Sequence, residues 1–171
     1  MTVGPKARRS GLPARDRRVT TRRVREDQRE RSVRADVPTG GGDVGVATDA
    51  EAARVQEREA LQLAHRVVDL AEDRKASDIV LLAVAGMTTL TDYFVICSGG
   101  SERQLGAIAD GISEGLKQDG YLPIGREGSP DAHWLLLDFG AVIVHVMAWP
   151  ERDYYGLEKL WSEAPLLLRI Q

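Results

Sequence analysis

The turn at residues 98–101, with the sequence SGGS, is the first place where this chain could carry out chemistry. A glycine-rich turn between a strand and a helix often binds phosphate, because free backbone N–H groups at the helix N-terminus point at the anion. No Lys-Ser or Lys-Thr pair follows this turn, and its spacing differs from the dinucleotide fingerprint. Metal-dependent nucleotidyl transfer also needs neighbouring carboxylates to hold Mg²⁺. Asp92 and Asp138 stand alone at predicted strand ends and Asp110 lies in a predicted helix, so we expect no such catalysis.

Nucleophilic catalysis and metal binding have no better support. Cys97 is the single cysteine, and its apolar neighbours predict a small buried hydrophobe. It cannot form an internal disulfide, and with three scattered histidines it cannot build a Cys-rich zinc site. His145 stands between Val144 and Val146. This position favours a histidine whose ring nitrogens are hydrogen-bonded within or beside a sheet over a general base. We therefore predict no catalytic residue, no metal and no cofactor.

Two long helices must position these residues. Thr48 and Glu51 form a capping box, and apolar residues then recur at spacings of three and four, so a helix is predicted from there to about residue 75. A second helix should begin after Ser101, with Gln104 completing another capping box. It should end at Gly120, where a left-handed residue is favoured.

Strands are predicted where apolar and β-branched residues run together, at 78–85, 92–97, 121–124, 133–139 and 141–149. Residues 125–131 are predicted to form a loop, and Gly140 alone should join the last two strands as an antiparallel hairpin. Pro150 suits the first turn of one closing helix. This order predicts an α/β fold of the mixed α+β type, with a sheet of about five strands and helices packed against it.

Charge and apolar content divide the chain into two parts. Residues 1–50 carry 12 basic against 7 acidic side chains, whereas residues 51–171 carry 11 against 19. All nine aromatic residues lie in the second part. We predict a disordered Arg-rich arm at 1–46 and a folded domain at 47–171. Three interpretations of the arm remain open: a start site set too far upstream, a tail without a role, and a tether for RNA. The four acidic residues at 16–30 argue against a transit peptide.

The longest apolar run, about nine residues from Ile79 to Met87, is shorter than the roughly 18 that a membrane helix needs. We therefore expect no role in a membrane. The lone cysteine suits a reducing compartment, so a cytoplasmic location is predicted.

Five strings occur in a characteristic order: SDIVLLAV at 77–84, LTDYFVICSG at 90–99, GYLPIGREG at 120–128, WLLLDFGAVIVHVM at 134–147 and YGLEKLW at 155–161. On these strings the stretch from Leu61 to Trp161 resembles the ribosomal silencing factor family, also called RsfS or Iojap-related proteins. The residues that fall on the family's characteristic positions are Asp92, Trp134, Asp138, His145, Tyr155, Leu157 and Trp161. Ala141 departs from the pattern, because relatives often carry an acid there, and the stretch before residue 46 has no counterpart.

The resemblance implies a non-catalytic protein that binds the large ribosomal subunit at ribosomal protein L-fourteen and sterically prevents the small subunit from joining. It further implies repression of translation, a fold similar to nucleotidyltransferases without their catalytic acids, and a homodimer in the free state. Two other functions remain open. One is an assembly factor for the large subunit, and the other is a divergent nucleotidyltransferase that uses the turn at 98–101.

A blocking factor needs an interface of about 800 Å² per partner with a few aromatic anchors. Trp134 is the leading candidate, Met147 is a candidate neighbour on the same sheet face, and Tyr155 is a weaker candidate. Core packing is the competing interpretation for each, and Leu157 and Trp161 are assigned to the core. Because residues 51–171 are acidic, rRNA should repel them, so any rRNA contact is expected to be peripheral.

Overall fold

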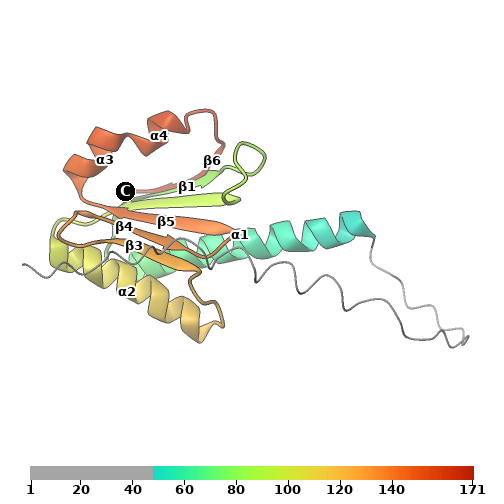
Figure 1. The fold of residues 1–171 in the computed structure, drawn as a ribbon, viewed down its shortest axis with the longest axis horizontal. Helices are drawn as coiled ribbons and strands as arrows, with labels where there is room; N and C mark the ends of the chain where they lie inside the picture. The colour runs from blue at the N-terminus through green and yellow to red at the C-terminus, as the bar shows by residue number, and fades with distance from the viewer. Residues whose placement is uncertain (1–47) are drawn as a thin grey trace, which may run out of the picture. The chain divides into compact units, whose positions relative to one another are not determined.

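The computed structural model describes residues 48–171, and the predicted arm at 1–46 lies outside the described residues. The elements follow one another as α1 (Asp49–Asp73), β1 (Ser77–Ala83), β2 (Tyr93–Ser98), α2 (Glu102–Gln118), β3 (Gly125–Ser129), β4 (Trp134–Asp138), β5 (Val142–Met147), α3 (Trp149–Tyr155), α4 (Leu157–Leu160) and β6 (Leu166–Ile170) (Figure 1).

One six-stranded sheet organises this part of the chain, in the order β3-β4-β5-β2-β1-β6. The central pair β2 and β5 is parallel, and the other neighbouring strands are antiparallel. Helices α1 and α2 cover one face of the sheet, and the short helices α3 and α4 lie over the other (Figure 1). The predicted fold class is therefore confirmed, with six strands in place of about five.

The two long helices begin where the sequence predicts. Thr48 caps α1, and both halves of its capping box with Glu51 are formed. Ser101 caps α2 by accepting a hydrogen bond from the backbone N–H of Gln104. The Gln104 side chain completes no second box. Its amide oxygen accepts from the N–H of Gly100, and its amide nitrogen donates to the carbonyl oxygen of Lys75, so it ties the start of α2 to the end of α1.

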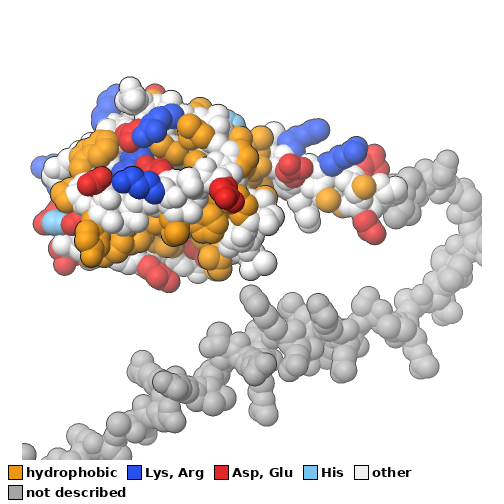
Figure 2. Space-filling model, turned by 90° about the horizontal axis from the view of Figure 1, so that it is seen from above, with side chains coloured by type: hydrophobic (Ala, Val, Ile, Leu, Met, Phe, Trp, Pro, Cys, Tyr) orange, Lys and Arg blue, Asp and Glu red, His pale blue; other side chains and the backbone are white. Residues whose placement is uncertain are grey.

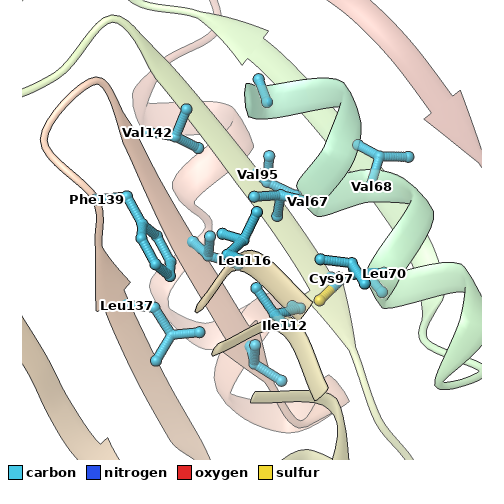
Figure 3. Packing of buried hydrophobic residues seen from close by; sticks show 14 of the residues in the cluster. Val67, Val68, Leu70, Val95, Cys97, Ile112, Leu116, Leu137, Phe139 and Val142 are labelled. Carbon is cyan, nitrogen blue, oxygen red and sulfur yellow. The ribbon is translucent and has the colours of Figure 1, made fainter. Parts of the chain in front are cut away.

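The main core lies between these helices and the sheet. The buried residues that Figure 3 labels in this cluster are Val67, Val68, Leu70, Val95, Cys97, Ile112, Leu116, Leu137, Phe139 and Val142. Cys97 has no exposed surface, and burial raises the pKa of its thiol to about 12, so the expectation of an inert hydrophobic cysteine is confirmed. Gly115 lets the helices approach closely, because a Cβ there would overlap the Leu70 side chain.

Three predicted elements are wrong. Residues 121–124 form no strand and leave Leu122 and Ile124 exposed, whereas the predicted loop that follows contains the edge strand β3. The single closing helix is divided into α3 and α4 by Gly156, whose φ of 56° is left-handed. Strand β6 was not predicted, and it forms because its backbone pairs with the outer edge of β1.

Candidate functional site

The second face of the sheet carries a smaller apolar cluster that α3, α4 and the residues after them cover. Its buried members are Val80, Leu82, Val84, Phe94, Ile96, Ile143, Met147 and Ala164, and Trp134, Leu136, Leu157 and Trp161 pack partly buried against it. Strand β5 explains the division: Val142, Val144 and Val146 face the main core, while alternate residues face this side. Figure 2 looks down on this face and shows hydrophobic side chains gathered among charged ones.

Trp134 lies at the centre of the candidate site. It pairs with Met147 across the β4–β5 hairpin, so both side chains lie on the same sheet face, as predicted. Its indole N–H donates to Nδ1 of His145 at 3.2 Å, and the Tyr155 ring lies 4.8 Å away between centroids. Beside it is a hollow of about 380 Å³, lined by Glu127, Gly128, Ala132, Trp134, Leu136 and Tyr155.

The three candidate binding residues differ in exposure. Trp134 is partly buried, Tyr155 is 52% exposed, and Met147 is fully buried. Trp134 and Tyr155 can therefore offer surface to a partner, whereas Met147 lies beneath them in the cluster. Met147 has no exposed surface with which to contact a partner. It packs opposite Trp134 and supports that residue from beneath.

His145 is buried and holds the indole ring in place. Its ring packs against Phe94 at 5.4 Å between centroids and against Trp134 at 5.8 Å. Burial lowers the pKa of His145 to about 4, so the imidazole is neutral at pH 7. Because Nδ1 accepts the indole hydrogen bond, the proton of the neutral ring sits on Nε2. The nitrogen that could act as a base is thus already occupied.

Strand β3 closes one side of the hollow. Gly128 has a φ of 77°, and a Cβ there would overlap the carbonyl oxygen of Trp134. Only glycine allows the two strands to pair this closely, and the pairing brings Glu127 to the rim. This contribution was not predicted, because the segment GREGS has neither the apolar alternation nor the β-branched residues of a strand.

The family-pattern acids lie at the opposite end of the sheet. Asp138 pairs with Ile143, at the far end of the hairpin from Trp134, and its carboxylate accepts from the backbone N–H of Gly140 at 2.8 Å. The backbone N–H of Asp92 donates to the carbonyl oxygen of Ala141 in the same region. The structure therefore does not bring either acid to the aromatic hollow, and Asp138 has a local task in the turn.

The turn at 98–101 has few polar groups left for a phosphate. The Gly99 N–H donates to the carbonyl oxygen of Met147, and the Gly100 N–H donates to the Gln104 side chain at 2.8 Å. The Ser98 hydroxyl is buried and accepts from Arg152 at 2.9 Å. The Ser101 hydroxyl accepts from the first turn of α2. These groups serve the fold, which argues against the turn as a nucleotide cradle.

A charged cluster lies beside the start of β4. The His133 ring lies between Glu151 of α3 and Glu102 of α2, with N···O distances of 3.1 and 3.3 Å. Hydrogen bonds raise the pKa of His133, and the bond to Glu151 contributes more than the bond to Glu102. These contacts tie the start of β4 to α3 and α2, and Glu127 places a negative charge at the rim of the hollow.

Two further findings concern residues 48–171. No three His, Cys, Asp or Glu side chains of this part gather closely enough to hold a metal ion. Within the same residues, no helix is sufficiently long and apolar to cross a membrane.

Comparison with known proteins places these features in context. The family model described as "Ribosomal silencing factor during starvation" matches residues 57–170. Ribosomal silencing factor RsfS of Bacillus subtilis is 44% identical over 95 residues, which cover 56% of this chain and 80% of that protein. A Mus musculus protein named "Mitochondrial assembly of ribosomal large subunit protein 1" is 38% identical over 101 residues, covering 56% of this chain and 43% of that protein. A crystal structure of a Chromobacterium violaceum protein has a TM-score of 0.59 at 35% identity, and the match covers 60% of this chain and 86% of that one.

Proposed function

Because the chain belongs to the ribosomal silencing factor family, we propose that it binds the large ribosomal subunit and keeps the small subunit from joining. The proposed contact is ribosomal protein L-fourteen, and the proposed outcome is repression of translation. The observation that carries the proposal is the surface formed by Trp134 and Tyr155 beside the hollow of about 380 Å³. The family model and the relatives' names support a role in silencing or in assembly of the large subunit.

The aromatic surface has the physical properties of a binding anchor. Tryptophan and tyrosine supply large contact areas at little cost in side-chain entropy, and they dominate the energetics of many interfaces. Trp134 is already oriented by His145 and by Tyr155, so binding need not immobilise it. We therefore assign Trp134 the leading contact, Tyr155 a secondary contact, and Met147 the support beneath.

The charge of the domain favours a protein partner over RNA. Residues 51–171 carry 19 acidic and 11 basic side chains, and Glu127 lines the hollow beside the aromatic surface. Phosphates would be repelled there, whereas a basic protein surface would be attracted. Contact with rRNA is accordingly proposed to be peripheral.

Blocking requires bulk at an interface and no bond-making step. We propose that the protein has no catalytic activity, because the groups of the turn at 98–101 are used by Gln104, Met147 and Arg152. A divergent nucleotidyltransferase would gain thermal stability from a nucleoside triphosphate with Mg²⁺ through mass action. We expect the melting temperature to stay unchanged in that test, and a rise of several degrees would favour the enzyme.

We further propose a cytoplasmic location and a homodimer in the free state that uses the same exposed face. Binding to the ribosome would then compete with self-association. Sedimentation of the free protein should give a concentration-dependent mass, and a monomer at all concentrations would refute the dimer.

Binding to purified L-fourteen tests the proposal directly. Trp134→Ala should weaken the affinity by about 2 kcal/mol, or about 30-fold. Tyr121→Ala is the control, because Tyr121 is an exposed aromatic residue that lies outside segment 149–161 and does not line the hollow. The contact would be refuted if the wild-type protein did not bind at physiological salt. It would also be refuted if both variants bound equally well in their folded states.

An assembly role is the second candidate, and the name of the mouse relative, which refers to assembly of the large ribosomal subunit, favours it. Deletion of the gene should then lead to immature large-subunit particles. If the protein only silences ribosomes, the deletion should leave mature large subunits. More of these subunits should then join small subunits under conditions in which translation is normally repressed.

A further inference from the structure

The segment 149–161 places Tyr155 against Trp134, and little of its own structure can hold it there. Its helices α3 and α4 have seven and four residues, far below the length at which a helix is stable by itself in water. Their position on the sheet must therefore come from side-chain contacts. The Trp161 ring supplies one at the far end of the segment, where it packs on Phe94 at 5.2 Å between centroids.

Arg152 supplies the polar counterpart in the middle of the segment. It is only 4% exposed, and its guanidinium reaches both strands beneath it. One terminal nitrogen donates to the backbone carbonyl of Asp78 in β1 at 2.7 Å and to the hydroxyl of Ser98 in β2 at 2.9 Å. The other two nitrogens donate to the carboxylate of Glu158 in α4 at 2.6 and 2.8 Å. A single side chain thus joins α3, α4, β1 and β2.

The charges around Arg152 are balanced. The Asp78 carboxylate lies 3.2 Å from the guanidinium and also binds Arg169 of β6 at 2.9 and 3.1 Å. Two arginines therefore face two acids. A buried charge of this kind is stable only while its partners remain, since removing one leaves the other desolvated and unpaired. Each nitrogen of the Arg152 guanidinium already has an acceptor, so Arg152 acts as a structural clamp and offers no donor to an anion.

We propose that Arg152 is the positioning residue of the aromatic surface. It holds α3 on the sheet, and α3 in turn holds Tyr155 against Trp134 at the edge of the hollow. The inference rests on the proposed function, because Arg152 is proposed to keep the aromatic surface in the arrangement that binds the large subunit. Arg152 itself is too deeply buried to touch a partner.

Arg152→Lys tests the proposal, because lysine keeps the charge and loses the planar fork that reaches three elements at once. Amide hydrogen exchange of residues 149–161 should accelerate by about tenfold relative to β1 and β2, in line with the loss of charge-assisted hydrogen bonds. The indole N–H resonance of Trp134 should also shift in the folded protein. Trp134 belongs to β4 and not to the segment, so a purely global destabilisation would leave that resonance in place.

Arg66→Lys is the matched control. Arg66 on α1 pairs with Asp119 at 2.7 Å on the opposite face of the sheet, and 42% of its side chain is exposed. Its variant should leave both the exchange of 149–161 and the Trp134 resonance unchanged. Glu158→Gln is the second test variant, since it removes one charge of the clamp without changing its shape. Glu158→Gln should also accelerate the exchange of residues 149–161 and shift the Trp134 resonance. The same two measurements can be made on it if Arg152→Lys does not fold.

The affinity for the large subunit completes the test. Arg152→Lys should bind about tenfold more weakly than wild type while Arg66→Lys binds normally. Faster exchange spread evenly over the whole domain, or an unmoved Trp134 resonance, would overturn the positioning role. A wild-type protein that does not bind the large subunit would refute the proposed function instead, and the exchange and resonance measurements would still test Arg152.

Discussion

His145 should make the stability of this protein fall on acidification, and the structure fixes the size of the effect. The imidazole is buried against Phe94 and accepts the indole hydrogen bond of Trp134 at 3.2 Å. A second proton on the ring would occupy Nδ1 and turn that acceptor into a donor facing another donor. Burial is the cause that lowers the pKa of His145 to about 4.

The magnitude follows from linkage between protonation and folding. An unfolded histidine takes up its proton near the ordinary pKa of 6.5, whereas the folded chain resists it until about pH 4. Stability is therefore fully present above pH 6.5 and decreases as the pH falls through this window. The complete loss is about 3 kcal/mol, and at pH 5 about 2 kcal/mol is already lost relative to pH 8.

Urea denaturation of the wild type and of His145→Gln at pH 8 and pH 5 measures this effect. Glutamine keeps an acceptor for the Trp134 indole and cannot titrate, so the wild type should lose about 2 kcal/mol more than the variant between the two pH values. His133→Asn serves as the histidine control and should not remove this loss. Equal losses in the wild type and His145→Gln would refute the argument that burial keeps the imidazole neutral.

Three further predictions concern the rest of the domain. Gly115→Ala should destabilise the fold by about 1–3 kcal/mol through overpacking between α1 and α2, whereas Gly106→Ala in the same helix meets only ordinary contact and should be neutral or slightly stabilising, as thermal unfolding can show. Cys97 should resist alkylation in the native state and react after denaturation, and rapid native labelling would contradict its burial. His133 has a raised pKa because of its two glutamate partners, so its stabilisation is full below pH 6.5 and is lost as the pH rises through its folded value. The stability gap between the wild type and His133→Asn should therefore be larger at pH 6 than at pH 8, and an equal gap would refute the ion pairs.

The elements with regular patterns could be predicted from the sequence. Thr48 marks the start of α1, and the alternation from Val142 to Met147 places one set of residues under α1 and α2 and the other under α3 and α4. Phe94 shares the face of Trp134 because β2 pairs in parallel with β5 and places Phe94 opposite Ile143, and the continuous apolar run of β2 has no alternation that predicts this. Met147 was predicted as a neighbour of Trp134 on the same sheet face, and the pairing of the two residues confirms this.

What the sequence could not provide depends on contacts made only in three dimensions. Strand β3 is polar and glycine-rich, and it exists because β4 offers a free edge that Gly128 can approach. Apolar residues at 121–124 suggested a strand, yet the segment forms no strand and its one backbone hydrogen bond to β4 runs from the N–H of Ile124 to the carbonyl oxygen of Asp138. Arg152 is one arginine among many, and nothing in the local pattern indicates that it is buried among partners distant in sequence.

Joining of purified ribosomal subunits shows whether the protein blocks their association. Large subunits are incubated with the protein, small subunits are added, and the joined particles are separated by sedimentation. We expect fewer joined particles and the protein in the large-subunit fraction, with about 30-fold more of the Trp134→Ala variant needed for the same effect. Undiminished joining at concentrations that saturate the large subunit would contradict the proposed function, as would a folded Trp134→Ala variant that blocks as well as the wild type.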